Sequence, residues 1–197
     1  MIRVNLTTFL DIVRAAGTPK LTAVRRLKQR GKYNPAHDFW LPLRRAIVEA
    51  HQREDVGLLD QLLPKITDQK KLSNYPDRIQ AYKTWWGKRD YKWFQPPDAE
   101  WRYGQVLVRV SPELGLKDDS GRIVVKLYFK KDRLSKLRAD VILHLLDTTV
   151  TPAGKNARVG ILDVPRSKLI QSTVEKPGLE AALRAEAAYI ATAWDEM

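Results

Sequence analysis

The apolar residues of this chain change their spacing near residue 100, and this change constrains the fold more than any other feature. Before it they recur every three or four residues, as at Leu21, Val24 and Leu27, which is the pattern of amphipathic helices. After it they alternate, as from Val106 to Val110, which is the pattern of half-buried strands. The sequence therefore predicts an α+β fold. In it a helical N-terminal half packs on a small β-sheet with two covering helices, in the order strand-strand-helix-strand-helix.

Turn and capping residues divide these two halves into elements. Thr8 and Asp55 are suited to begin helices, Gly17 and Gly31 to end them, and Pro76 to open another. We expect helices over residues 8–17, 18–31, 43–52, 55–64, 76–86, 132–147 and 177–194, and strands over residues 106–110, 123–129 and 158–164. We interpret residues 112–121 as the connection between the first two strands, which we expect to pair.

An aromatic stretch rich in proline separates the two halves. Neither periodicity continues from Gly87 to Trp101, and Pro96-Pro97 interrupts regular structure there. We therefore expect an all-helical basic region over residues 1–95 and a mixed α/β region over residues 96–197, either as two units or as one compact unit.

Several classes of protein are excluded by composition. The chain has no cysteine, which rules out disulfides, thiolate catalysis and cysteine-ligated metal centres. The N-terminal residues lack a secretory apolar run, and the uncharged stretch 141–146 is far shorter than the ~20 residues of a membrane span. These features favour a soluble, cytoplasmic protein without membrane contact.

The formal net charge of +12 is distributed unevenly along the chain. Residues 1–53 hold 11 Lys and Arg against 3 Asp and Glu, and residues 104–176 hold 14 against 8. The last 21 residues are acidic, with 4 Asp and Glu against 1 Arg. A directed acidic partner, DNA or RNA above all, is therefore more plausible than charge for solubility alone.

Two groups of residues are candidates for nucleic-acid contact. One lies on the predicted helices of the N-terminal half, and the other on the polar face of the predicted strands, where a tyrosine would stack on a base. The candidates are Lys20, Arg25, Arg26, Lys28, Arg30, Lys32, Arg44, Arg45, Arg109, Lys126, Tyr128 and Lys130. The alternative interpretation is a solvated helical surface and the ordinary polar side of a sheet.

Motifs for catalysis are missing from the sequence. It contains no phosphate-binding Gly-Lys-Ser/Thr loop, no dinucleotide fingerprint and no Gly-x-Ser-x-Gly elbow. Its three histidines, His37, His51 and His144, are not spaced to share a metal ion on a helix. A non-enzymatic protein without a cofactor or a bound metal is the first expectation.

One arrangement supports an enzymatic alternative. Pro112-Glu113, a strand that contains Lys126, a helix and a further strand resemble the order of the PD-(D/E)XK nuclease superfamily over about 60 residues. The resemblance implies a metal-dependent nuclease with Glu113, Asp163 and Lys126 as its site. The family also has an acidic residue two positions before the lysine, where this sequence has Val124.

A third hypothesis is a protein–protein interaction module. The aromatic segment around Trp93, Phe94 and Trp101 or the acidic last helix would then be the contact, and the basic charge would meet an acidic protein. The same aromatic residues serve equally well as a buried seam between the two halves. The sequence leaves the oligomeric state open.

Overall fold

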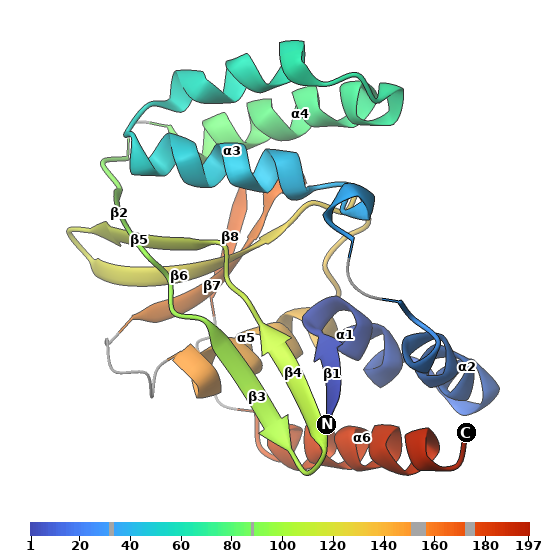
Figure 1. Cartoon of the computed structure of the whole chain (residues 1–197). Helices are drawn as coiled ribbons and strands as arrows, with labels where there is room; N and C mark the ends of the chain where they lie inside the picture. The colour runs from blue at the N-terminus through green and yellow to red at the C-terminus, as the bar shows by residue number, and fades with distance from the viewer. Residues whose placement is uncertain (32–33, 88, 151–156, 172–175) are drawn as a thin grey trace.

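The computed structural model describes residues 1–31, 34–87, 89–150, 157–171 and 176–197, which form an α+β fold with two β-sheets (Figure 1). The helices are α1 (Leu6–Arg14), α2 (Gly17–Lys28), η1 (Pro35–His37), α3 (Leu41–Gln52), η2 (Val56–Lys65), α4 (Gln69–Trp86), α5 (Lys136–Val150), η3 (Val164–Arg166) and α6 (Leu179–Asp195). The strands are β1 (Ile2–Asn5), β2 (Lys92–Phe94), β3 (Ala99–Tyr103), β4 (Val106–Val110), β5 (Leu114–Asp118), β6 (Gly121–Tyr128), β7 (Arg158–Asp163) and β8 (Lys168–Gln171).

A three-stranded sheet joins the N-terminus of the chain to its middle, in the order β1-β4-β3. Strand β1 runs parallel to β4, and its buried Ile2 and Val4 alternate with exposed Arg3 and Asn5. The prediction of an all-helical region over residues 1–95 therefore needs correction, because that region contains β1 and β2. A four-residue strand is too short for its alternation to stand out beside the helix that follows it.

The second sheet has five strands in the order β2-β5-β6-β7-β8. The predicted pairing of the first two strands is wrong, because β4 lies in the other sheet and β5 pairs with β6. The segment expected to be a connection contains β5 and a tight turn at Asp119 and Ser120. In that turn the Ser120 N–H donates to the Asp118 carboxylate at 2.9 Å. Gly121 follows with φ at +108°, a conformation that favours glycine.

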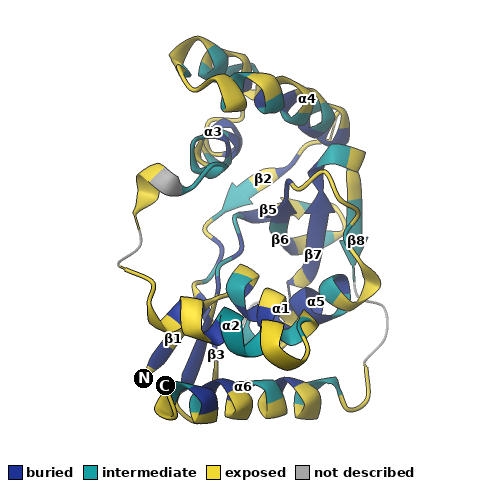
Figure 2. Cartoon of the chain, turned by 90° about the vertical axis from the view of Figure 1, so that its right-hand side faces the viewer, coloured by how far each residue is buried: buried dark blue, intermediate teal, exposed yellow. Residues whose placement is uncertain are grey.

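Helices cover both faces of the five-stranded sheet. Val125 and Leu162 belong to a core shared with α3 and α4, while Val124 and Ile161 belong to a second core shared with α1, α5 and α6. Figure 2 shows β7 largely in dark blue, as a buried strand, and helices whose outer sides are exposed. The prediction that one face of these strands is polar and open is wrong, because α5 packs over that face. Each core contains residues from both halves of the sequence.

Several helices differ from the prediction in where they begin or in type. Asn5 rather than Thr8 caps α1, since its carboxamide oxygen accepts the Thr8 N–H at 2.8 Å. Helix α4 begins at Gln69, so Pro76 lies inside this helix and does not open it. Residues 56–65 form a 3₁₀ helix in place of an α-helix, with Asp55 as the predicted cap. The elements α5, β7 and α6 lie close to their predicted positions.

One histidine is part of the core beneath α3 and α4. The His51 ring is fully buried, stacks on Trp86 at a centroid distance of 3.8 Å, and lies 2.6 Å from the Tyr82 hydroxyl through Nε2. Burial lowers the pKa of His51 to about 4, because a charged imidazole would lose its hydration there. Burial also raises the pKa of Tyr82. His51 is therefore a neutral core residue at physiological pH.

Within the part of the chain that the structure describes, every helix is too short or too polar to cross a lipid bilayer.

Candidate anion-binding site

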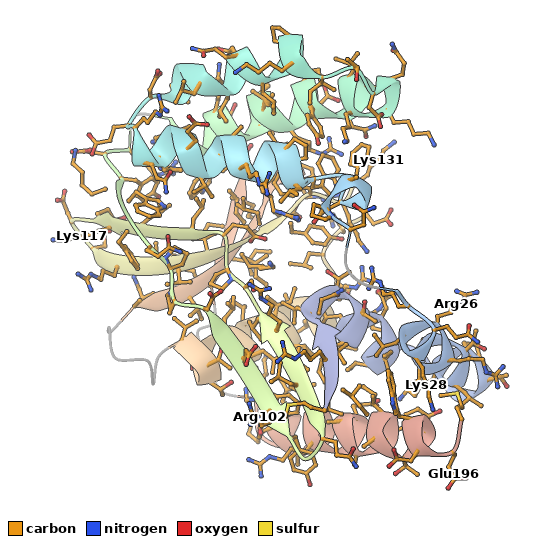
Figure 3. All side chains as sticks on the ribbon, viewed as in Figure 1. Arg26, Lys28, Arg102, Lys117, Lys131 and Glu196 are labelled. Atoms are coloured by element: carbon orange, nitrogen blue, oxygen red, sulfur yellow. The ribbon has the colours of Figure 1, made fainter. Side chains whose placement is uncertain are left out.

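The predicted cations of α2 fall into two groups. Arg25 and Arg26 are exposed and make no ion pair among the described residues, and Figure 3 shows Arg26 on the outer side of α2. Lys20 and Lys28 instead join α2 to α6. The Lys20 ammonium lies 2.7 Å from the Glu186 carboxylate, and Lys28 donates to the Trp194 carbonyl at 2.7 Å. Only the first group is free to meet a ligand.

The remaining predicted cations of the N-terminal half lie on or beside two other helices. Arg30 donates to the Thr8 hydroxyl at 3.2 Å, which brings it to the first turn of α1. On α3, Arg44 pairs with Asp38, whereas Arg45 is exposed and makes no ion pair with a described residue. Lys32 lies outside the described residues.

The predicted strand residues do not share one open face. Arg109 lies on β4 in the three-stranded sheet, whereas Lys126 and Tyr128 lie on β6 in the other sheet. Tyr128 is only 9% exposed and its hydroxyl donates to the Asp132 carbonyl at 3.0 Å, so its ring is not available to stack on a base. Its burial follows from the packing of α5 over this face of the sheet. Lys130, just beyond the strand, is exposed.

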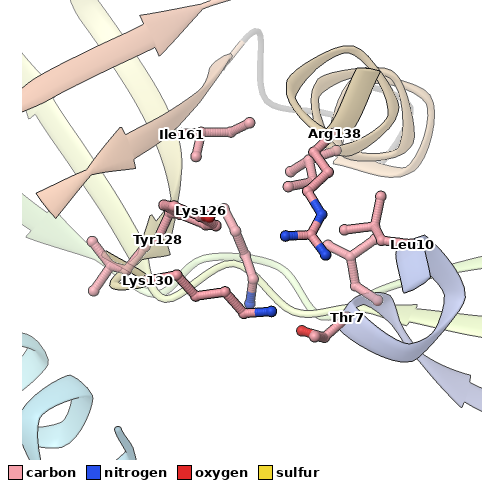
Figure 4. A pocket seen from close by; sticks show the side chains of 10 residues that line it. Thr7, Leu10, Lys126, Tyr128, Lys130, Arg138 and Ile161 are labelled. Atoms are coloured by element: carbon pink, nitrogen blue, oxygen red, sulfur yellow. The ribbon is translucent and has the colours of Figure 1, made fainter. Parts of the chain in front are cut away.

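A cavity of about 70 Å³ opens where the end of β6 meets the starts of α1 and α5. Lys126, Lys130 and Arg138 are among the residues that line it (Figure 4). In the figure the two ammonium groups and the guanidinium face the same space, and the Thr7 hydroxyl lies beside them. The walls are apolar and are formed by Leu6, Leu10, Ile142 and Ile161. We call this cavity the basic pocket.

Two of the three cations of the basic pocket have acidic neighbours. Lys126 lies 2.7 Å from Glu113, and Arg138 lies 2.6 Å from Asp11. Lys130 makes no ion pair with any described residue. The Nε–H of Arg138 is buried and has no hydrogen-bond acceptor within the described part of the chain. The pocket therefore keeps one uncompensated positive charge and one unsatisfied donor, which together favour an anion.

Further cations surround the basic pocket, and a chain of contacts connects them to it. Arg44 lies 3.9 Å from the Glu113 carboxylate that also binds Lys126. Lys126 donates to the Ser111 carbonyl, and Arg109 donates to the Ser111 hydroxyl at 3.0 Å. Arg30 donates to the hydroxyl of Thr8, which follows Thr7 in the sequence. Arg44 and Arg30 of the first basic stretch therefore contact neighbours of the pocket residues, although neither lines the cavity.

The three residues of the predicted nuclease site are only partly brought together. Glu113 contacts Lys126 as that hypothesis requires, but its second carboxylate oxygen accepts the Leu127 N–H at 2.8 Å. Asp163 is buried at the end of β7, opposite Tyr128, and pairs with Arg166 at 3.1 Å. Among the described residues, no group of three or more His, Asp or Glu side chains is arranged to hold a metal ion. Both carboxylates are already engaged by cations of the chain.

Most of the aromatic segment is interior. Trp85, Trp86 and Trp101 are 4%, 8% and 6% exposed, and Trp93 and Phe94 on β2 are partly buried. The first two lie in the core under α3 and α4, whereas Trp101 lies in the core with α1, where its ring is 5.7 Å from that of Phe9. These rings therefore fill the two cores, and they do not form an exposed aromatic contact surface.

Two polar residues of the basic pocket were not among the binding residues predicted from the sequence. Arg138 lies on an apolar helix, and Thr7 precedes the residue expected to cap the first helix. The only sequence signal was an arginine placed among the leucines and valines of the helix that covers the sheet. Such a residue must find an acidic or anionic partner when it is largely enclosed.

The sequence matches no protein-family model, and no curated protein shows significant similarity to it.

Proposed function

We propose that this chain is a non-enzymatic, cytoplasmic nucleic-acid-binding protein that holds the phosphate backbone of DNA or RNA. The observation that carries the proposal is the set of three cations, Lys126, Lys130 and Arg138, that the end of β6 and the start of α5 bring to the basic pocket. Phosphate oxygens are the usual partners of clustered Lys and Arg side chains, because binding releases condensed counterions.

The surroundings of the pocket support binding without sequence readout. Tyr128, which lines the pocket, is buried, so its ring does not offer bases a stacking surface. Arg25 and Arg26 are exposed on α2 and extend the positive surface beyond Arg30. Contacts of this kind position a nucleic acid through its backbone and are tolerant of its sequence.

The proposal is tested by fluorescence anisotropy of an internally labelled oligonucleotide at a series of salt concentrations. We expect affinity to fall steeply with salt, and we expect Lys130→Ala to reduce the slope of log K against log salt by about 1. Arg25→Ala with Arg26→Ala should reduce it by up to about 2. These side chains make no ion pair with described residues, so the fold should tolerate their loss.

Lys117→Ala is the matched control. Lys117, on β5, is likewise an exposed lysine without an ion pair among the described residues, and Figure 3 shows it on the opposite side of the molecule from α2. Its loss should leave the salt slope unchanged. An affinity that does not change with salt concentration would overturn the proposal. So would an equal effect of Lys130→Ala and Lys117→Ala on the salt slope. Cleavage of the oligonucleotide after addition of Mg²⁺ would overturn its non-enzymatic part and favour the nuclease hypothesis.

A further inference from the structure

We infer that the basic pocket takes the terminal phosphate of a nucleic-acid strand in preference to an internal phosphodiester. This inference rests on the proposed function and specifies which part of the nucleic acid enters the pocket. It is carried by three features of the pocket: its enclosure, the number of its cations and its unsatisfied charge.

Because the pocket is enclosed, it favours a phosphate that is bonded to the nucleic-acid strand on one side only. The pocket lies between the first turn of α1, the end of β6 and the first turn of α5, and its apolar walls come from α1, α5 and β7. The side chains of Lys126 and Arg138 are only 20% and 13% exposed, so their charged ends are recessed. An internal phosphodiester continues through a sugar on both sides and would need a groove open at two ends. A terminal phosphate can enter from one opening.

The number of cations fits a terminal phosphate. Such a group has three non-bridging oxygens and a charge of about −1.5 to −2 at neutral pH, whereas a phosphodiester has two such oxygens and a single charge. Lys126, Lys130 and Arg138 supply donors from three side chains around one space, and the Thr7 hydroxyl lies beside them (Figure 4). Each oxygen can therefore have its own cationic donor.

The unsatisfied groups of the pocket point the same way. Glu113 and Asp11 balance Lys126 and Arg138, but Lys130 has no acidic partner and the Arg138 Nε–H has no acceptor within the described residues. Because the walls are apolar, the local dielectric is lower than in water, so the one uncompensated positive charge attracts an anion more strongly than it would on an open surface. The energetic preference for the terminal group follows from its third non-bridging oxygen, which gives the unsatisfied donors of the pocket a further acceptor.

The test compares one oligonucleotide sequence in three forms: with a 5′-phosphate, with a 3′-phosphate, and with hydroxyl groups at both ends. The label is placed on an internal base so that both ends stay free. We expect at least one phosphorylated form to bind about tenfold more tightly than the hydroxyl form, which is the effect of one good charge-assisted contact. The two phosphorylated forms distinguish which end of the strand enters the pocket.

Lys130→Ala separates the pocket from the rest of the basic surface. It should abolish the preference for the phosphorylated form and leave the thermal unfolding midpoint unchanged, because Lys130 is exposed and unpaired within the described structure. Lys117→Ala should retain the preference. Equal binding of the three forms by the unmodified protein would overturn this inference and leave the proposed function standing. Failure of all three to bind would overturn both.

Discussion

Replacement of Glu113 should change stability and affinity in opposite directions. Its carboxylate is 12% exposed, lies 2.7 Å from the Lys126 ammonium and accepts the Leu127 N–H at 2.8 Å. Glu113→Gln keeps an oxygen for Leu127 but removes the charge that balances Lys126. Glu113→Ala removes both interactions. Both substitutions remove the negative charge of Glu113 and make the basic pocket more positive, so they should strengthen phosphate binding.

The magnitudes follow from these two contacts. A hydrogen bond between charged groups contributes about 1.5–3 kcal/mol, so Glu113→Gln should lower the free energy of unfolding by about 2 kcal/mol. Glu113→Ala also leaves the buried Leu127 N–H without an acceptor, which costs about 1–3 kcal/mol more. For a chain of 197 residues, a loss of 2 kcal/mol corresponds to a decrease in Tm of about 4–8 °C.

Urea unfolding followed by tryptophan fluorescence measures these differences, and an unchanged m-value would show that the unfolding reaction is the same. Glu49→Gln is the control, because Glu49 is 51% exposed and pairs with Arg53 on the surface of α3. Its loss should change stability by less than about 0.5 kcal/mol. The affinity of the same variants for the phosphorylated oligonucleotide gives the second readout.

A Glu113→Gln variant as stable as Glu49→Gln would refute the assigned role of the carboxylate in the fold. A variant that loses stability and also binds phosphate more weakly would refute the assignment of Lys126 to the basic pocket. In that case Glu113 would contribute to binding directly, as a metal ligand does.

Two further predictions concern the core. The pKa of His51 is about 4 in the folded protein, against an ordinary value of 6.5. As the pH falls, this histidine is therefore protonated in the unfolded chain before it is protonated in the folded one. The stability that neutral His51 contributes is complete above pH 6.5 and decreases below it, by about 2 kcal/mol at pH 5. In urea titrations at pH 5 and above pH 6.5, His51→Phe should not show this loss of stability. An identical pH dependence of the variant and the unmodified protein would contradict the prediction. Gly115→Ala should destabilise the protein by more than about 2 kcal/mol, because its Cβ would lie 2.4 Å from the Phe94 carbonyl oxygen of β2. Gly160→Ala, with a side-chain carbon of Leu169 nearest at 3.0 Å, should be milder in the same urea assay, and an equal effect of the two substitutions would argue against the β2–β5 contact.

Local patterns were sufficient wherever an element is long and its neighbours in sequence determine its form. The apolar spacing predicted α5 and α6, and alternation predicted β7, because side chains on one face of these elements meet a single core. The short strands β1, β2, β3, β5 and β8 were missed. Strands of three to five residues give little periodicity unless they are as rich in valine as β4, and their hydrogen bonds depend on partners distant in the sequence.

The candidate site was predicted in composition but not in arrangement. Lys126 and Lys130 were among the predicted anion contacts, and the structure brings both to the basic pocket, where binding remains a prediction. Tyr128, by contrast, is enclosed by α5. Lys20, predicted with the same reasoning as Arg25, is neutralised by a residue 166 positions further along the chain. No local pattern distinguishes these cases.

The sequence by itself determined the α+β class, most of the longer elements and the amount of positive charge, because each of these depends on composition or on neighbours within a few residues. Only the tertiary structure decided which positive charges are balanced. Arg138 meets Asp11 across 127 residues, and Lys126 meets Glu113 across a strand pair, whereas Lys130 meets no acid among the described residues. Charges in folded proteins are balanced by whatever the packing brings within a few ångströms, and that distance is independent of separation along the chain.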